Sequence, residues 1–183
     1  MGICGTMQKT QGVKMKIIEG LKKVKDLLKK AEDLRIKVRD HSALADYETP
    51  KYKDQKKQVA EWIQAHSDVL QEISRLRVAI QKTNFETFVT IVLEGKNISK
   101  CIAEWIHRRR DLANYELNMW QLLTDRGIRE GIGKSVSGEP MEIKIVRFYD
   151  PETRDKKVAA YSEEPSLIDA KLEIVNAVTD LIE

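Results

Sequence analysis

Apolar residues recur every three or four positions in two long stretches near the start of the chain. The first stretch covers residues 15–39 and the second ends at Lys82. Alternating steps of three and four, without proline, predict two amphipathic helices with heptad seams. The seam positions are Ile17, Leu21, Val24, Leu28, Ala31 and Val38, flanked by Leu27 and Leu34, and then Val59, Trp62, His66, Val69, Ile73, Leu76 and Ile80.

Residues 40–52 separate these stretches and contain helix-breaking and capping residues, including Asp40 and Pro50. A loop of this length lets the second helix fold back on the first. The pattern therefore predicts an antiparallel helical hairpin.

The periodicity then changes. Phe85–Leu93 is rich in β-branched and aromatic residues and is expected to form a strand buried on both faces or covered by a partner, followed by a turn at Glu94–Asn97. Helical spacing resumes over Ile98–Leu123, with Asn97 or Ser99 as a cap. We expect a third helix there.

The last third of the chain begins with a glycine-rich segment. Two strand-like runs, Met141–Tyr149 and Lys156–Tyr161, flank the turn-forming residues 150–155 and predict a β-hairpin. An amphipathic helix is expected from about Ser166, with Ile168, Leu172, Val175, Val178 and Ile182 on one stripe.

Together these elements predict a mainly α fold with a small β element. It consists of a long, coiled-coil-like antiparallel helical hairpin, a third helix, a β-hairpin and a C-terminal helix. We expect an N-terminal tail at 1–14, and the helical hairpin, short strand and third helix over 15–126. A glycine-rich connector at 127–140 and a β-hairpin with the C-terminal helix over 141–183 complete the same domain.

Composition favours long solvated helices over thick globular layers, because 33% of residues are charged and 6% aromatic. The core is expected to be thin and to be completed by partner subunits. Lysines prevail from Lys14 to Lys30 and acidic residues from Glu163 to Glu183, so the two ends carry opposite charge. The net charge of +3 is too small to indicate nucleic acid, and no apolar run is long enough for a membrane span.

Two cysteines without a metal-type cluster are typical of a reducing compartment, so we expect a cytoplasmic protein. The start Met1-Gly2-Ile3-Cys4 fits the loose pattern for N-myristoylation with a second acyl chain. That pattern is short, and Met7 or Met15 could equally be the natural start. The sequence therefore favours an unmodified N-terminus.

Common catalytic signatures do not occur: the sequence contains no GxGxxG, GxxxxGK[ST], HExxH, GxSxG or CxxC. The three histidines, at positions 41, 66 and 107, fall in different predicted elements without a metal-ligand pattern. We expect a protein that is not an enzyme and holds neither metal nor cofactor.

One cluster invites a functional hypothesis, the run His107-Arg108-Arg109-Arg110-Asp111 in the third predicted helix. Arg109 continues the Ile98, Ile102, Trp105 stripe and should face inward or across an interface, and an inward guanidinium needs a carboxylate or another anion. The favoured interpretation is structural pairing with Asp111, Glu116 or an acidic residue of the C-terminal helix.

The competing interpretation is a ligand pocket between subunits. Guanidinium groups bind phosphate bidentately and aromatic rings stack on bases, so a nucleotide-like molecule would be held without being turned over. The residues proposed for this site are Arg108, Arg109, Arg110, Trp105, Tyr115, Thr83, Asn84 and Thr87, with Trp120 as a further aromatic.

Several short motifs resemble the septicolysin-like family of small bacterial and phage proteins. They are Ile80-Gln81-Lys82-Thr83-Asn84, Thr87, Gly95-Lys96-Asn97-Ile98, the Ala103–Asp111 segment, Glu142-Ile143-Lys144, and Ile168–Glu173 with Asn176 and Leu181. The resemblance spans most of residues 16–182 and implies a helical hairpin with a small β element, in a phage or prophage protein. Trp105, Ile106 and the glycine-rich connector depart from the family pattern, which puts in doubt any transfer of site residues.

Three functions follow as hypotheses. The leading one is a homo-oligomeric interaction or scaffold protein, phage- or prophage-encoded, acting as a virion component or as an inhibitor of a host protein. The second is an anti-defence sponge that sequesters a cyclic nucleotide or ADP-ribose-type signal at the arginines. The third is a membrane-active, cytolysin-like protein. Neither nucleic acid nor membrane is the expected partner, and the expected location is the host cytoplasm or the virion.

Overall fold

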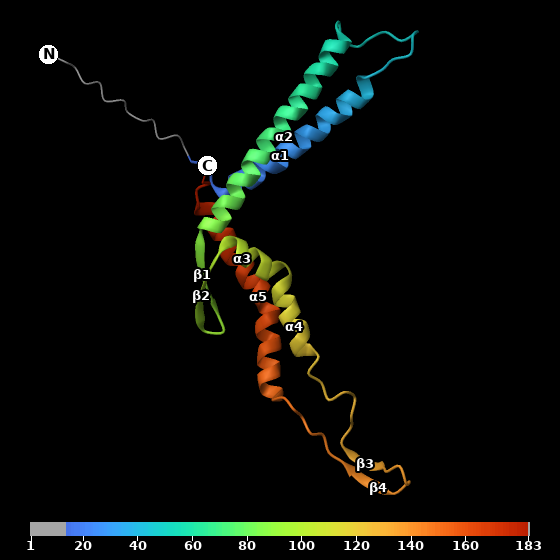
Figure 1. Ribbon diagram of the computed structural model, residues 1–183, viewed down its shortest axis with the longest axis vertical. Coiled ribbons are helices and arrows are strands. Elements are labelled where there is room, and N and C mark those ends of the chain that lie inside the picture. Colours follow the sequence, from blue (N-terminus) through green and yellow to red (C-terminus); the bar gives the residue numbers. More distant parts are fainter. Residues whose placement is uncertain (1–13, 183) are drawn as a thin grey trace, which may run out of the picture. The chain divides into compact units, whose positions relative to one another are not determined.

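A computed structural model describes residues 14–182 and is mainly α with two small antiparallel β-hairpins, which confirms the predicted fold class (Figure 1). The lipidation motif and nearly all of the predicted tail at 1–14 lie outside the described residues. The elements are α1 (Ile17–His41), α2 (Gln55–Glu86), β1 (Phe88–Leu93), β2 (Lys96–Cys101), α3 (Ile102–His107), a π-helical turn (Arg108–Leu112), α4 (Ala113–Gln121), β3 (Gly131–Lys134), β4 (Pro140–Ile143) and α5 (Pro151–Val178).

Two compact units divide the chain. Among the described residues, the first unit holds residues 14–86 and 174–182, and the second holds Thr87–Glu173. In the first unit, α1 and α2 run side by side as the predicted hairpin (Figure 1). Its central core cluster consists of Ala31, Leu34, Trp62, Val69 and Ile73, with Val24, Leu27, Val38 and Val59 partly buried against it.

The buried row of α1 differs by one position from the predicted seam. Leu21 and Leu28 were expected inside but are 47% and 44% exposed. Gly20 takes the inner position because a side chain there would meet the Leu181 methyl group at 2.7 Å and Ile80 at 3.6 Å. The close approach of the C-terminal tail thus selects glycine and turns Leu21 outward.

The C-terminal tail is fixed to the first unit by backbone and side-chain contacts. The Ile17 amide donates to the Thr179 carbonyl at 3.0 Å, and the Leu181 amide to the Met15 carbonyl at 2.8 Å. Fully buried Thr83 accepts from the Ile182 amide at 2.9 Å. These bonds join residues far apart in the sequence.

The second unit begins with a β-hairpin that the sequence only half predicted. The strand starts at Phe88, because α2 continues through Phe85 to Glu86. Its side chains alternate between buried and exposed, so one face is buried, where the sequence predicted two buried faces or cover by a partner. Residues 96–101 form the partner strand β2, where the turn and the start of the third helix were predicted. Glu94 and Gly95, both with positive φ, make the tight turn that forces this pairing.

The predicted β-hairpin at 141–161 is wrong. Residues 151–161 belong to α5, which begins far ahead of the expected Ser166. Asp150 accepts from the Thr153 amide at 3.0 Å, and Pro151 occupies the first helical position, where its missing N–H costs nothing. The second hairpin instead pairs β3, inside the predicted connector at 127–140, with β4.

Candidate functional site

The arginine run occupies the π-helical turn between α3 and α4. A π-helical turn is wider than an α-helical one, so the side chains no longer follow the 100° spacing assumed from the sequence. π-bulges also occur frequently at functional sites. The three arginines diverge here, and each meets a different carboxylate.

Arg108 is the most enclosed of the three and pairs with Glu164 of α5. Its Nη2 donates to Glu164 Oε2 at 2.9 Å while Nε donates to Oε1, and the Glu164 side chain is only 4% exposed. This hydrogen-bonded pair, only partly opposed by desolvation, raises the pKa of Arg108. The guanidinium also lies 5.5 Å from the centre of the Tyr161 ring. Such a buried pair needs both members, since either alone would be an uncompensated charge.

Arg109 and Arg110 are closer to solvent. Arg109 Nη1 donates to Asp169 of α5 at 2.6 Å, which matches the predicted pairing with an acidic residue of the C-terminal helix. Its side chain is 37% exposed and does not face inward, a position that Arg108 takes, so the alternative that Arg109 faces across an interface stays a prediction. Arg110 contacts Asp111 and His107, each at 3.2 Å.

The aromatic residues proposed for stacking are not equivalent. Trp105 is completely buried, and its indole Nε1 donates to the Val89 carbonyl at 2.9 Å. It is a core residue that anchors α3 to β1 and has no open ring face for a ligand. Tyr115 of α4 is 69% exposed. Of the three rings proposed as alternatives for stacking, Trp105 is therefore excluded, whereas Tyr115 is exposed and Trp120 is half-buried.

The three polar residues proposed for the same site are spread over both units. Thr83 and Asn84 belong to the first unit, and Thr83 uses its hydroxyl group for the Ala79 and Ile182 backbone. Thr87 belongs to the second unit, where its carbonyl accepts from the Ile102 amide at 3.0 Å. Thr83 thus serves the helix packing, and Thr87 joins β1 to α3.

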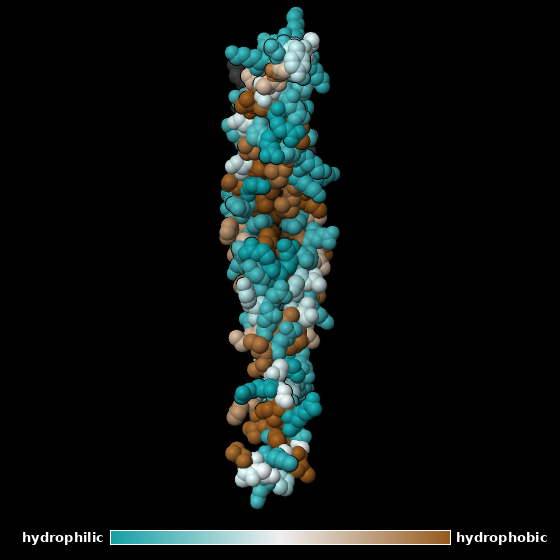
Figure 2. All heavy atoms as spheres, turned by 90° about the vertical axis from the view of Figure 1, so that its right-hand side faces the viewer, coloured by the Kyte–Doolittle hydropathy of each residue, from teal (hydrophilic) through white to brown (hydrophobic). Residues whose placement is uncertain are grey.

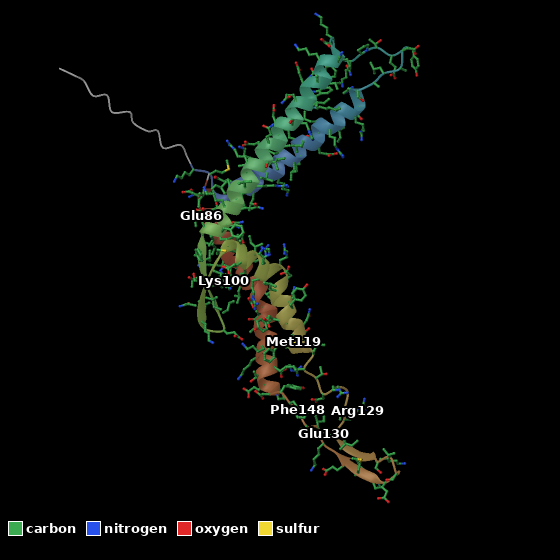
Figure 3. The ribbon with its side chains drawn as sticks, viewed as in Figure 1. Glu86, Lys100, Met119, Arg129, Glu130 and Phe148 are labelled. Atoms are coloured by element: carbon green, nitrogen blue, oxygen red, sulfur yellow. The ribbon has the colours of Figure 1, made fainter. Side chains whose placement is uncertain are left out.

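Two cavities of about 440 and 390 Å³ flank the Arg108–Glu164 pair. Leu93 and Ile98 of the β1–β2 hairpin line both, and Leu112 adds apolar surface to the larger one. Lys100, labelled on β2 in Figure 3, also lines the larger cavity. The walls combine apolar contact with several charged side chains, among them Lys96, Lys100 and Glu104 beside the Arg108–Glu164 pair.

Residues 14–182 contain no group of three or more potential metal-binding side chains. None of the helices in this range combines the length and apolar character needed to cross a membrane.

A second candidate surface lies on the α1–α2 hairpin. If the inner rows are given heptad positions a and d, the d positions Leu34 and Leu76 are followed by arginines, Arg35 and Arg77. The d positions Gly20, Leu27, Trp62 and Val69 are followed by four apolar residues, Leu21 and Leu28 on α1, and Ile63 and Leu70 on α2. All four are between 44% and 55% exposed. Ala60, Ser67 and Ser74 extend this row on α2 with small exposed side chains. We call the four apolar side chains with these three small ones the outer row.

Both halves of the outer row share one flank of the hairpin. Lys23 and Glu72, which each precede an a position, form an ion pair at 2.8 Å and so mark the other flank. Residues that follow d point to the opposite side from residues that precede a. Leu28 and Leu70 also lie at about the same level, because Gly20 lies beside Ile80 further along the same antiparallel pair.

Sequence reasoning missed Glu164 and the outer row for different reasons. Glu164 stands in a polar run before Pro165, which looks like a helix boundary. Its spacing of four from Ile168, itself four from Leu172, is the signal that places it on the buried stripe. In the outer row, Leu21 and Leu28 were assigned to the inner seam because both rows satisfy steps of three and four, and the α2 members were not assigned to any surface.

Comparison with known proteins gives a family but no activity. A crystal structure of a functionally unknown conserved protein from Corynebacterium diphtheriae has a similar fold, with a TM-score of 0.55 and 19% identity over 92% of this chain and 99% of that one. No curated protein matches the sequence. The family model described as "Family of unknown function (DUF6847)" matches residues 23–181. The chain therefore belongs to this family, DUF6847.

Proposed function

We propose that this protein is a non-catalytic interaction protein that assembles with copies of itself through the outer row of the α1–α2 hairpin. The observation that carries the proposal is the row of half-exposed Leu21, Leu28, Ile63 and Leu70 at heptad spacing. Large apolar side chains aligned along two helices are typical of a surface that another helix covers.

The chemistry of this flank supports a second hairpin as the partner. Small Ala60, Ser67 and Ser74 let a neighbouring helix approach closely. Because Leu28 and Leu70 lie at one level, face-to-face docking of two hairpins brings both leucines of each copy into a central layer. The product is a four-helix bundle, which is the common way to bury two helical hairpins.

The test replaces the central leucines with charges. In the Leu28→Lys/Leu70→Lys double variant, burying lysines in the interface should abolish association through the hairpin, while the half-exposed positions leave the fold intact. The average mass in sedimentation velocity at micromolar concentration should fall relative to the wild type. Unchanged mass would contradict the proposal.

A matched control puts the same charges elsewhere. Ile36 and Val78 are 37% and 60% exposed and occupy the outward f positions of the same two helices. The Ile36→Lys/Val78→Lys variant should keep the mass of the wild type. If it dissociates as fully as the leucine variant, general charge and not the outer row explains the effect.

The sequestration hypothesis draws less support, because each of the three arginines already pairs with a carboxylate. Its remaining basis is the pair of cavities beside Arg108. Thermal-shift measurements with cyclic nucleotides and ADP-ribose test it directly. A ligand at 100 times its Kd stabilises the fold by about 2.7 kcal/mol.

A further inference from the structure

Residues 122–150 connect α4 to α5 in the second unit and form a two-stranded arm. At its base, Arg147 donates to both carboxylate oxygens of Asp125, at 2.7 and 2.6 Å. Further out, the Ile145 amide donates to Glu130 Oε1 at 3.2 Å, and the β3–β4 hairpin forms the tip. Figure 3 labels Glu130 on the segment that enters β3 and Phe148 on the segment that leaves β4.

The arm exposes apolar side chains and an unpaired strand edge. Ile132, Val136 and Phe148 are at least 86% exposed, and Figure 2 shows hydrophobic spheres at the lower end, where this segment lies. In the part of the chain that the structure describes, β4 pairs only with β3. A two-stranded hairpin by itself is marginally stable in water, and an open edge is a template for another strand.

The backbone alternation identifies which groups of β4 face outward. The Ser135 amide donates to the Glu139 carbonyl, and the Glu139 amide to the Ser135 hydroxyl group, so the backbone bonds of residues 135 and 139 face each other, and pairs along the ladder alternate from there. Residues 141 and 143 consequently bond to β3, and the Ile145 amide points the same way toward Glu130. The N–H and C=O groups of Glu142 and Lys144 therefore point to the free edge.

The sequence of this edge is complementary to itself. In Met141-Glu142-Ile143-Lys144-Ile145, antiparallel pairing about Ile143 sets Glu142 opposite Lys144 of a second copy, twice. The same register sets Met141 opposite Ile145 and Ile143 opposite Ile143 on the other face. Glu142 and Lys144 are mostly exposed, with side chains 67% and 73% accessible.

We propose that β4 pairs edge to edge with β4 of a second copy of this chain, antiparallel about Ile143, joining two arms into one four-stranded sheet. The alternation of inward-facing and outward-facing backbone groups along β4 supports this register. Glu142 and Lys144, which face outward, become hydrogen-bonded pairs, and Ile143 becomes the non-bonded pair with close side chains. Cross-strand contacts between opposite charges and between apolar residues stabilise the sheet. This interface is separate from the hairpin interface proposed above.

Charge reversal with mixing tests the proposal, in full chains that also carry Leu28→Lys/Leu70→Lys to remove hairpin association. Glu142→Lys sets lysine opposite lysine, and Lys144→Glu sets glutamate opposite glutamate. Each alone should lower the association constant about tenfold or more. An equimolar mixture should restore it, because every cross-strand pair is then Glu opposite Lys.

The mixture separates the interface from effects within one chain. Both variants lose the Lys144–Glu142 ion pair of their own strand, 3.1 Å in the wild type, and mixing cannot restore that contact. Sedimentation velocity of each variant and of the mixture gives the constants. The proposal is overturned if either variant associates as strongly as the Leu28→Lys/Leu70→Lys protein from which it was made. It is also overturned if the association constant of the mixture is no higher than that of each variant alone.

A backbone variant gives an independent readout. Glu142→Pro removes an N–H that faces the free edge and leaves the amides bonded to β3 in place, so the arm should persist while self-association falls. Hydrogen exchange of the Ile143 amide reports whether the arm is intact. An intact arm with undiminished association would show that the β4 edge is not the interface. If the hairpin proposal alone fails, the leucine background behaves as wild type and the arm variants still give their answer.

Discussion

The interior of the first unit and the interior of the second unit are stabilised by different kinds of contact. In the first unit, the α1–α2 core is a row of aliphatic side chains around one tryptophan, with no charged residue among its members. In the second unit, buried Ile102 and Trp105 lie on the same short helix that leads to the Arg108–Glu164 ion pair. Apolar periodicity thus describes the first unit well, whereas the second depends on specific partners that no periodicity reveals.

The largest expected effect comes from the core of the first unit. Ile73 is 4% exposed in the inner row, so Ile73→Ala leaves a cavity and should lower the free energy of unfolding by about 3 kcal/mol. Urea unfolding followed by circular dichroism measures the loss. Val78→Ala, at an outward position of the same helix where the side chain is 60% exposed, is the control and should cost about 1 kcal/mol or less.

Breaking the buried pair of the second unit should have the next largest effect. Glu164→Gln removes the negative charge and leaves Arg108 uncompensated, which should cost about 2 kcal/mol, less than for a fully enclosed pair because the Arg108 side chain is 22% exposed. Adding Arg108→Met should recover much of that stability. A double variant less stable than either single one would argue against charge compensation as the reason for the pair.

The neighbouring Arg109–Asp169 pair sharpens the comparison, because it has the same chemistry with more solvent. Its side chains are 37% and 60% exposed. Asp169→Asn should therefore change stability by less than about 1 kcal/mol, and high salt should erase the difference. A loss as large as that of Glu164→Gln would mean that burial is not what separates the two pairs.

The smallest expected effect is a pH dependence of stability that is confined to the arm. The hydrogen bond from Arg147, aided by Tyr149, lowers the pKa of Asp125. Because the pKa of Asp125 is lowered in the folded arm, its ion pair with Arg147 stabilises the arm fully above the ordinary pKa of Asp. That stabilisation is lost as the pH falls through the folded pKa. The protection factor of the Ile145 amide, which corrects for the slower intrinsic exchange in acid, should therefore fall only in acid. In the Asp125→Asn variant it should be low already at neutral pH.

Particular residues explain how much of this molecule the sequence could predict. The helical hairpin followed from spacing alone, because its core is apolar and local to two helices. The inner row was misplaced at Leu21 and Leu28, since the reason for Gly20 lies in Leu181 at the other end of the chain. The start of α5 was missed although Asp150 and Pro151 carry a standard capping pattern.

The candidate sites were less accessible to sequence reasoning. The arginine run was visible, but its π-helical turn and the partner Glu164 depend on tertiary contacts. The proposed grouping of Thr83 and Asn84 with the arginines assumed one compact site, and the structure assigns those residues to the first unit. In the sequence, Trp105 fits both an apolar helix stripe and a stacking site, and only its full burial in the structure decides for core packing.

Self-association of the full chain tests the central claim most directly. Sedimentation equilibrium over a range of micromolar concentrations should give a multiple of the single-chain mass for the wild type. That multiple should fall for Leu28→Lys/Leu70→Lys and stay for Ile36→Lys/Val78→Lys. A wild-type protein with the mass of one chain at every concentration would contradict the account.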